Sequence, residues 1–124
     1  MTRPALILFA HGARDPAWAS PLQRVREAVR SQSPQLRVEL AFLEFMAPNL
    51  EDCVGVLVAA GCERIIIAPM FIAQGGHLKN DLPLIVDRLQ ARHPGVVFDL
   101  RGPIGEAEGV VQAMAAHLLE LPGD

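Results

Sequence analysis

Several features that would place a protein in a specialised class are missing from this sequence. Its 124 residues include two cysteines and no CxxC spacing, so neither a disulfide framework nor a cysteine-ligated site is indicated. We expect Cys53 and Cys62 to be small buried hydrophobic residues. No apolar run reaches the roughly 18 residues that a membrane span needs. No basic run with interleaved aromatic residues, which is typical of nucleic-acid binders, occurs either. We therefore expect neither a membrane nor a nucleic acid as a partner.

Signals for export and for disorder are also missing. The start of the chain carries one cation and leads directly into an apolar run, without the small-residue cleavage site of a secretory signal, so we expect a cytoplasmic protein. With 51% hydrophobic and 20% charged residues, the composition argues against disorder. Because the length suits one core and no linker or repeat is present, we expect a single domain over residues 1–124.

Apolar periodicity predicts four strands alternating with four helices. The strands are expected at residues 5–10, 37–45, 65–70 and 96–100. The first three helices are expected from Ser20, after Asn49 as the N-cap, and behind a cap at Asn80 or Asp81. The last helix is expected from about residue 106 to 119. Its inward face would consist of Val110, Val111, Met114 and Leu118.

This alternation predicts an α/β fold with a parallel sheet. The strands start about 30 residues apart, which is the length of a βαβ unit. We therefore expect a three-layer sandwich of the flavodoxin or Rossmann type, in which a four-stranded parallel sheet carries helices on both faces. The strand order 2-1-3-4 is our expectation. The C-terminal ends of the strands then share one edge, where open α/β folds bind ligands.

Three side chains that suit metal or proton chemistry follow these strands. His11 comes directly after the first strand, and His77 follows the third. Glu44 interrupts an apolar stretch, and we expect it to be partly buried. Gly75 and Gly76 permit backbone conformations or a close ligand approach that a side chain would obstruct. Two imidazoles and a carboxylate at one edge make a candidate site for a divalent metal or for proton transfer.

Other interpretations of these residues remain open or fit less well. His11 could simply hydrogen-bond a turn, and Trp18, Met70 and Phe71 could either line a pocket for a flat ligand or pack in the core. A histidine phosphatase would carry an arginine immediately before the histidine, where this chain has Ala10. The sequence also lacks the GxGxxG fingerprint, a Walker loop and a GxSxG elbow. Metal or acid–base chemistry remains.

Four motifs resemble, in order, those of the CbiX-type sirohydrochlorin chelatases. They are FAHGARDP at residues 9–16, AFLEFMAP at 41–48, IAPMFIAQGGH at 67–77 with DLP at 81–83, and GPIG at 102–105. The resemblance covers nearly the whole chain, and the length is similar to that of the small single-domain members. Ala13 departs from the pattern, because many relatives have a serine after His-Gly, so any hydroxyl contact there is lost.

The resemblance implies a chelatase-like fold, a homodimer and a reaction. Members insert Co²⁺, Fe²⁺ or, in some cases, Ni²⁺ into a sirohydrochlorin-type tetrapyrrole without ATP or another nucleotide, toward cobalamin or siroheme. By motif, His11 and His77 would be the metal-handling, catalytic histidines and Glu44 the matching carboxylate. The residues expected to bind the carboxylate-rich tetrapyrrole are Arg14, Gly75, Gly76 and Lys79.

Two other functions would use the same pocket. The protein could be a non-catalytic carrier that binds a metal or a tetrapyrrole and passes it on. It could also be a metal-dependent hydrolase with the same ligand set, because two histidines and a carboxylate are chemically permissive. These residue types also do not select one metal, since the affinity of such sites rises toward copper for almost any arrangement.

Overall fold

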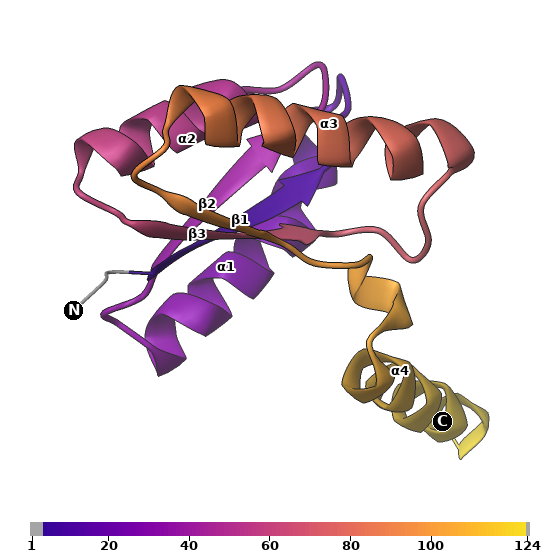
Figure 1. The fold of residues 1–124 in the computed structure, drawn as a ribbon. Coiled ribbons are helices and arrows are strands. Elements are labelled where there is room, and N and C mark those ends of the chain that lie inside the picture. The colour runs from indigo at the N-terminus through magenta and orange to yellow at the C-terminus, as the bar shows by residue number, and fades with distance from the viewer. Residues whose placement is uncertain (1–3, 124) are drawn as a thin grey trace.

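A parallel sheet of four strands forms the middle layer of the molecule (Figure 1). The computed structural model describes residues 4–123. The strands are β1 (Pro4–Ala10), β2 (Arg37–Phe42), β3 (Arg64–Pro69) and β4 (Val97–Leu100). Their order is β2-β1-β3-β4, and every neighbouring pair is parallel. The α/β fold class and the 2-1-3-4 strand order are therefore confirmed.

Three helices cover the sheet, one on one face and two on the other (Figure 1). They are α1 (Ser20–Gln32) on the first face, and α2 (Leu50–Ala59) and α3 (Gly76–Arg92) on the second. Successive side chains of a strand point to opposite faces, so each strand supplies both layers of core. In β3, Ile65 and Ile67 are fully buried among the residues of α2 and α3, whereas Ala68 packs on the α1 side.

Both ends of α2 match the sequence prediction. The Asn49 side chain accepts a hydrogen bond from the amide of Asp52 at 2.8 Å, and this satisfies a donor that the first turn leaves free. After the helix, Gly61 adopts a φ of +90°, a conformation that favours glycine.

Both cysteines are buried and unpaired, as expected. Each is 3% exposed, and burial, with a contribution from the Glu39 carboxylate, raises the pKa of the Cys53 thiol to about 12. Since the thiolate is the reactive form, we predict that the folded protein reacts negligibly with Ellman's reagent at pH 8, and that two thiols react in urea. Rapid reaction of either thiol in the folded protein would contradict this packing.

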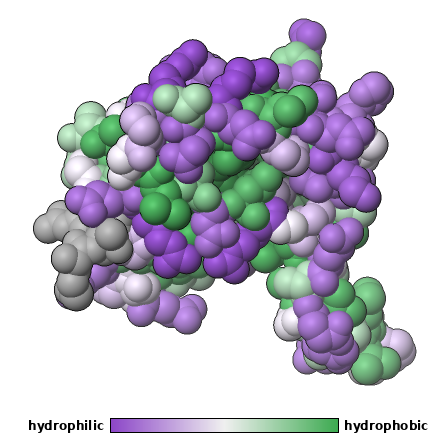
Figure 2. All heavy atoms as spheres, viewed as in Figure 1, coloured by the Kyte–Doolittle hydropathy of each residue, from purple (hydrophilic) through white to green (hydrophobic). Residues whose placement is uncertain are grey.

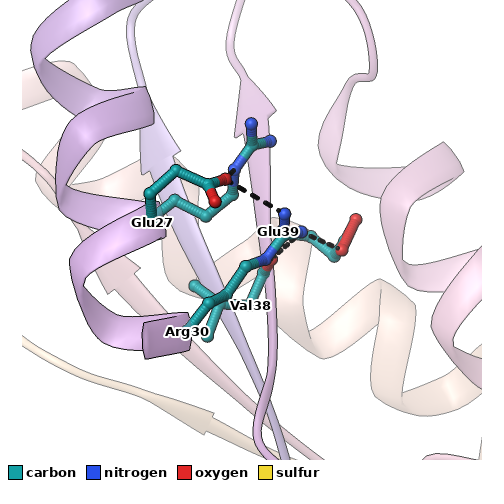
Figure 3. A network of polar contacts seen from close by, with 5 residues as sticks. Glu27, Arg30, Val38 and Glu39 are labelled. Atoms are coloured by element: carbon teal, nitrogen blue, oxygen red, sulfur yellow. Dashed lines mark hydrogen bonds and ion pairs between the residues drawn. The ribbon is translucent and has the colours of Figure 1, made fainter. Parts of the chain in front are cut away.

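Arg30 fixes α1 over β2 (Figure 3). Its guanidinium donates to the backbone oxygen of Val38 at 2.7 Å and to the Glu39 carboxylate at 2.8 Å. A further contact at 3.2 Å joins it to Glu27 on its own helix. α1 packs mainly against β2, and Leu6 of β1 and Ala68 of β3 are only partly buried on this face of the sheet.

Two predicted boundaries are wrong. β2 ends at Phe42 and not at residue 45, because the chain leaves the sheet there and Phe45 adopts a left-handed conformation with a φ of +66°. α3 begins at Gly76, with Gly75 as its N-cap, and not behind a cap at residue 80 or 81. The longer helix packs Leu78 against the core, and this contact extends it upstream of Pro83, which lies inside the helix.

The last helix differs most from the prediction. α4 (Glu108–Glu120) follows the short 3-10 helix η2 (Ile104–Glu106) and projects away from the sheet (Figure 1). None of its residues is buried, and Val111 and Leu118 are 38% and 60% exposed, so the expected inward packing of this helix is wrong within one chain. Over residues 4–123, no helix has the length and hydropathy that crossing a bilayer would require.

Candidate functional site

His11 lies where the chain leaves β1, at the C-terminal edge of the sheet. Its exposed ring is tilted against the ring of Phe71, with 4.5 Å between the centroids. Phe71 follows the neighbouring strand β3 and is 6% exposed, so the core holds it in place. The segments after β1 and β3 therefore meet, as the strand order requires.

A backbone hydrogen bond holds the Glu44 segment beside the His11 segment. The amides of Leu43 and Glu44 donate to the carbonyl oxygens of Ala10 and His11, at 2.9 Å and 3.0 Å. The Glu44 side chain is exposed, because residues 43–45 have left the sheet, so its expected partial burial is wrong. The structure thus brings His11 and Glu44 into adjacent segments, with the carboxylate open to solvent.

The backbone conformation and surroundings of residue 12 explain why it is a glycine. Its φ is +89°, and a Cβ atom at this position would overlap the backbone carbonyl of Glu44. Any other residue would be strained by the conformation and by this contact. Gly12 therefore permits the close approach of the segments that carry His11 and Glu44.

His77 is the second residue of α3 and is exposed. No side chain caps this helix, although the Lys79 amide donates to the carbonyl of Gly75 at 3.0 Å. An uncapped helix N-terminus with a lysine in its first turn favours an anionic group. Added Cβ atoms on Gly75 and Gly76 would meet nothing within 4 Å, and neither φ is positive, so these glycines leave the helix start open but are not required by its conformation.

The three candidate metal ligands do not form a complete coordination site in the residues that the structure describes. Over residues 4–123, no three His, Cys, Asp or Glu side chains form a group that could hold a metal ion. The assignment of His11, Glu44 and His77 to the metal stays a prediction.

Arg14 contacts Phe45, a residue that the sequence analysis did not identify. Its guanidinium lies 4.8 Å from the centroid of the Phe45 ring, in a cation–π arrangement. Phe45 is 58% exposed and has a φ of +66°, so a strained turn presents an aromatic ring to solvent beside Glu44. The sequence carries no signal for it, because left-handed residues are typically Gly, Asn or Asp.

These groups can perform a limited set of reactions. An exposed imidazole and an exposed carboxylate can take up protons or ligate a metal ion. Arg14 and the first turn of α3 offer a cation and free amides to carboxylates. The edge thus suits an anionic organic ligand and a cation.

Comparisons with known proteins agree with this arrangement. The sirohydrochlorin cobaltochelatase of Saccharolobus islandicus is 33% identical, and the match covers 93% of both chains. The CbiX protein of Marinobacter aquaeolei VT8, assigned to cobalamin (vitamin B12) biosynthesis, has a structure that matches with a TM-score of 0.85, 29% identity and coverage of 97% and 98%. The structure of SirB from Bacillus subtilis with Fe³⁺ matches with a TM-score of 0.80 and 26% identity, over 99% of this chain and 48% of SirB.

The relatives differ in length. The chain spans between 38% and 62% of the length of five further sirohydrochlorin cobaltochelatases, which are 27% to 33% identical over the matched parts. The family model of CbiX matches residues 5–121, which is nearly the whole sequence. The chain therefore belongs to the CbiX family.

Proposed function

We propose that this protein inserts a divalent metal ion into sirohydrochlorin or a closely related tetrapyrrole, without ATP. The observation that carries the proposal is the meeting of His11, Phe71 and the Glu44 segment at the C-terminal edge, in a chain of the CbiX family. Relatives named sirohydrochlorin cobaltochelatase make Co²⁺ the first metal to test, with Fe²⁺ and Ni²⁺ next.

The reaction sets clear demands on the site. The macrocycle loses two pyrrolic protons as one M²⁺ ion enters, so the exchange conserves charge and needs bases close to the ring. We assign His11 and His77 to metal delivery, one of them also accepting a ring proton, and Glu44 to metal capture or proton removal. A site without a closed cage suits this task, because a cage would retain the ion that has to be transferred.

Arg14 and Lys79 would anchor the carboxylates of the tetrapyrrole. We predict that Arg14→Ala and Lys79→Ala each raise the KM for sirohydrochlorin by about tenfold, as expected for losing one charge-assisted hydrogen bond, with a smaller change in kcat. Arg24→Ala, which removes an exposed arginine from α1, is the matched control and leaves KM unchanged. Unchanged KM in both test variants would remove these residues from the binding site.

Three further properties belong to this proposal. The protein acts as a homodimer, it is a single domain over residues 1–124, and it works in the cytoplasm. The length and the lack of a linker support the single domain, and the family membership supports the homodimer.

A measurement of catalytic turnover tests the proposed chelatase function. The protein is mixed with Co²⁺ or Fe²⁺ and a large excess of sirohydrochlorin, and insertion is followed in the visible spectrum against a protein-free control. We expect insertion faster than the control and many product molecules per protein. Insertion that stops at one equivalent would indicate a carrier. No insertion, together with turnover of small esters or phosphates by the metal-loaded protein, would indicate a hydrolase.

A further inference from the structure

Phe45 has a backbone conformation that its own side chain disfavours. Over residues 4–123, it is the one residue other than glycine with a positive φ, of +66°. The Met46 amide donates to the Glu44 carbonyl at 2.8 Å, and this bond closes a γ-turn with Phe45 at its centre. A γ-turn with a positive φ is rare and strained, whereas glycine adopts a positive φ at no steric cost. The geometry of the turn therefore does not explain why residue 45 is a phenylalanine.

The segments on both sides of Phe45 hold this turn in place. Before it, the Glu44 amide donates to the His11 carbonyl at 3.0 Å. After it, the Met46 side chain is partly buried and packs against the core on the α1 face of the sheet. Phe45, in contrast, is 58% exposed. The backbone thus presents an aromatic ring to solvent at a fixed place.

A second exposed apolar side chain lies on the other side of His11. Figure 2 shows hydrophobic surface at several places between hydrophilic side chains. At the C-terminal edge, Phe45 follows β2 and Ile72 follows β3, on either side of the strand β1 that leads to His11. Ile72 is 70% exposed, and its backbone is also fixed, because a Cβ atom on Gly105 would overlap it. A flat ligand above His11 would therefore have an exposed apolar side chain on each side.

Arg14 covers part of the Phe45 ring and leaves the rest free. Its guanidinium carbon lies over the ring, 4.8 Å from the centroid. This cation–π contact holds a flexible arginine beside an aromatic surface. One place on the edge thus offers a planar apolar contact together with a donor suited to carboxylates. A ligand that uses both has an apolar ring system with an anionic rim.

We propose that the Phe45 ring stacks on a face of the tetrapyrrole and holds Arg14 where its guanidinium meets a carboxylate of the rim. Phe45 is then a positioning residue, which sets the place of the macrocycle relative to His11 and Glu44 and takes no part in proton transfer or metal binding. The strained turn fixes the ring before the ligand arrives, so less conformational freedom is lost on binding. This inference rests on the proposed chelatase function.

Substitutions of Phe45 separate a role in binding from a role in folding. Phe45→Gly removes the ring and relieves the positive φ, so the midpoint of urea unfolding should stay at or above the parent's value. Phe45→Leu keeps an apolar side chain without a planar ring. Both variants should bind metal-free sirohydrochlorin about tenfold more weakly, as expected for the loss of one aromatic stacking contact. Phe45→Tyr keeps the ring and should restore most of the affinity that the leucine variant loses.

The contact with Arg14 is tested by a double-mutant cycle of Phe45→Leu and Arg14→Ala. Because the ring holds the guanidinium, we expect the double variant to lose less affinity than the product of the two single losses. Losses that multiply would contradict the shared contact.

The measurement is a titration of the full chain with metal-free sirohydrochlorin, followed in the visible spectrum with no metal present. Val56→Ala is the matched control, because Val56 is 59% exposed but lies on α2, and it should bind as the parent does. Parent-like affinity of Phe45→Leu, or a lowered urea midpoint in Phe45→Gly, would overturn the inference. If the parent inserts metal while Phe45→Leu binds normally, this inference alone fails. A parent that binds no tetrapyrrole would overturn the proposed function as well.

Discussion

Replacing His11 or His77 with alanine is expected to slow Co²⁺ insertion into sirohydrochlorin by about 100-fold or more. Loss of a positioned acid–base group typically costs about 10²–10⁴-fold, and each imidazole would also be lost as a metal ligand. Both side chains are exposed, so their removal should leave the fold unchanged. The measurement is the initial insertion rate from the visible spectrum, with kcat and KM determined separately.

His93→Ala is the matched control for these two variants. His93 lies at the C-terminal end of α3, away from the functional edge, where its ring lies 6.5 Å from that of Phe98. We expect it to keep the parent's insertion rate. If His11→Ala and His77→Ala also match the parent, the assignment of the metal-handling residues is wrong.

Gly12→Ala is expected to lower the free energy of unfolding by about 3 kcal/mol or more, because strain at a positive φ adds to a clash with fixed backbone. The new methyl group would overlap the carbonyl of Glu44, which belongs to backbone and has little freedom to move. Stability is measured by urea unfolding, and the insertion rate of the fraction that remains folded is measured beside it. We expect that rate to fall as well, since the segments of His11 and Glu44 would be forced apart.

Gly55→Ala is the matched control for Gly12→Ala. Gly55 lies inside α2, is exposed, and has nothing within 4 Å of an added Cβ atom. There, alanine should stabilise the protein by about 0.5–1 kcal/mol through its helix propensity. Equal effects at the two positions would show that the close approach at Gly12 is not needed for the fold.

Local patterns predicted the sheet and most of its helices well. The strand runs are apolar because helices or neighbouring segments cover them, and the spacing of about 30 residues left few topologies open. Asn49 and Gly61 marked the ends of α2 because caps are set by local chemistry. Proximity of His11 to the segment after β3 followed from the strand order alone.

The misses have physical causes that lie outside local sequence. Phe45 has no side-chain feature that signals a left-handed turn, and this turn ends β2 early and exposes Glu44. α3 starts upstream because Leu78 gains tertiary contact. α4 has an inward-facing pattern, but none of its residues is buried, because an apolar pattern shows that a surface is suited to packing and does not show what packs on it.

The most direct test of the account is the coordination of Co²⁺ added to the protein alone, measured by X-ray absorption at the cobalt edge. We predict two imidazole ligands in the parent, one in His11→Ala and one in His77→Ala, with oxygen donors in the remaining positions. A spectrum without imidazole scattering, or one that neither substitution changes, would contradict a shared metal site at the C-terminal edge.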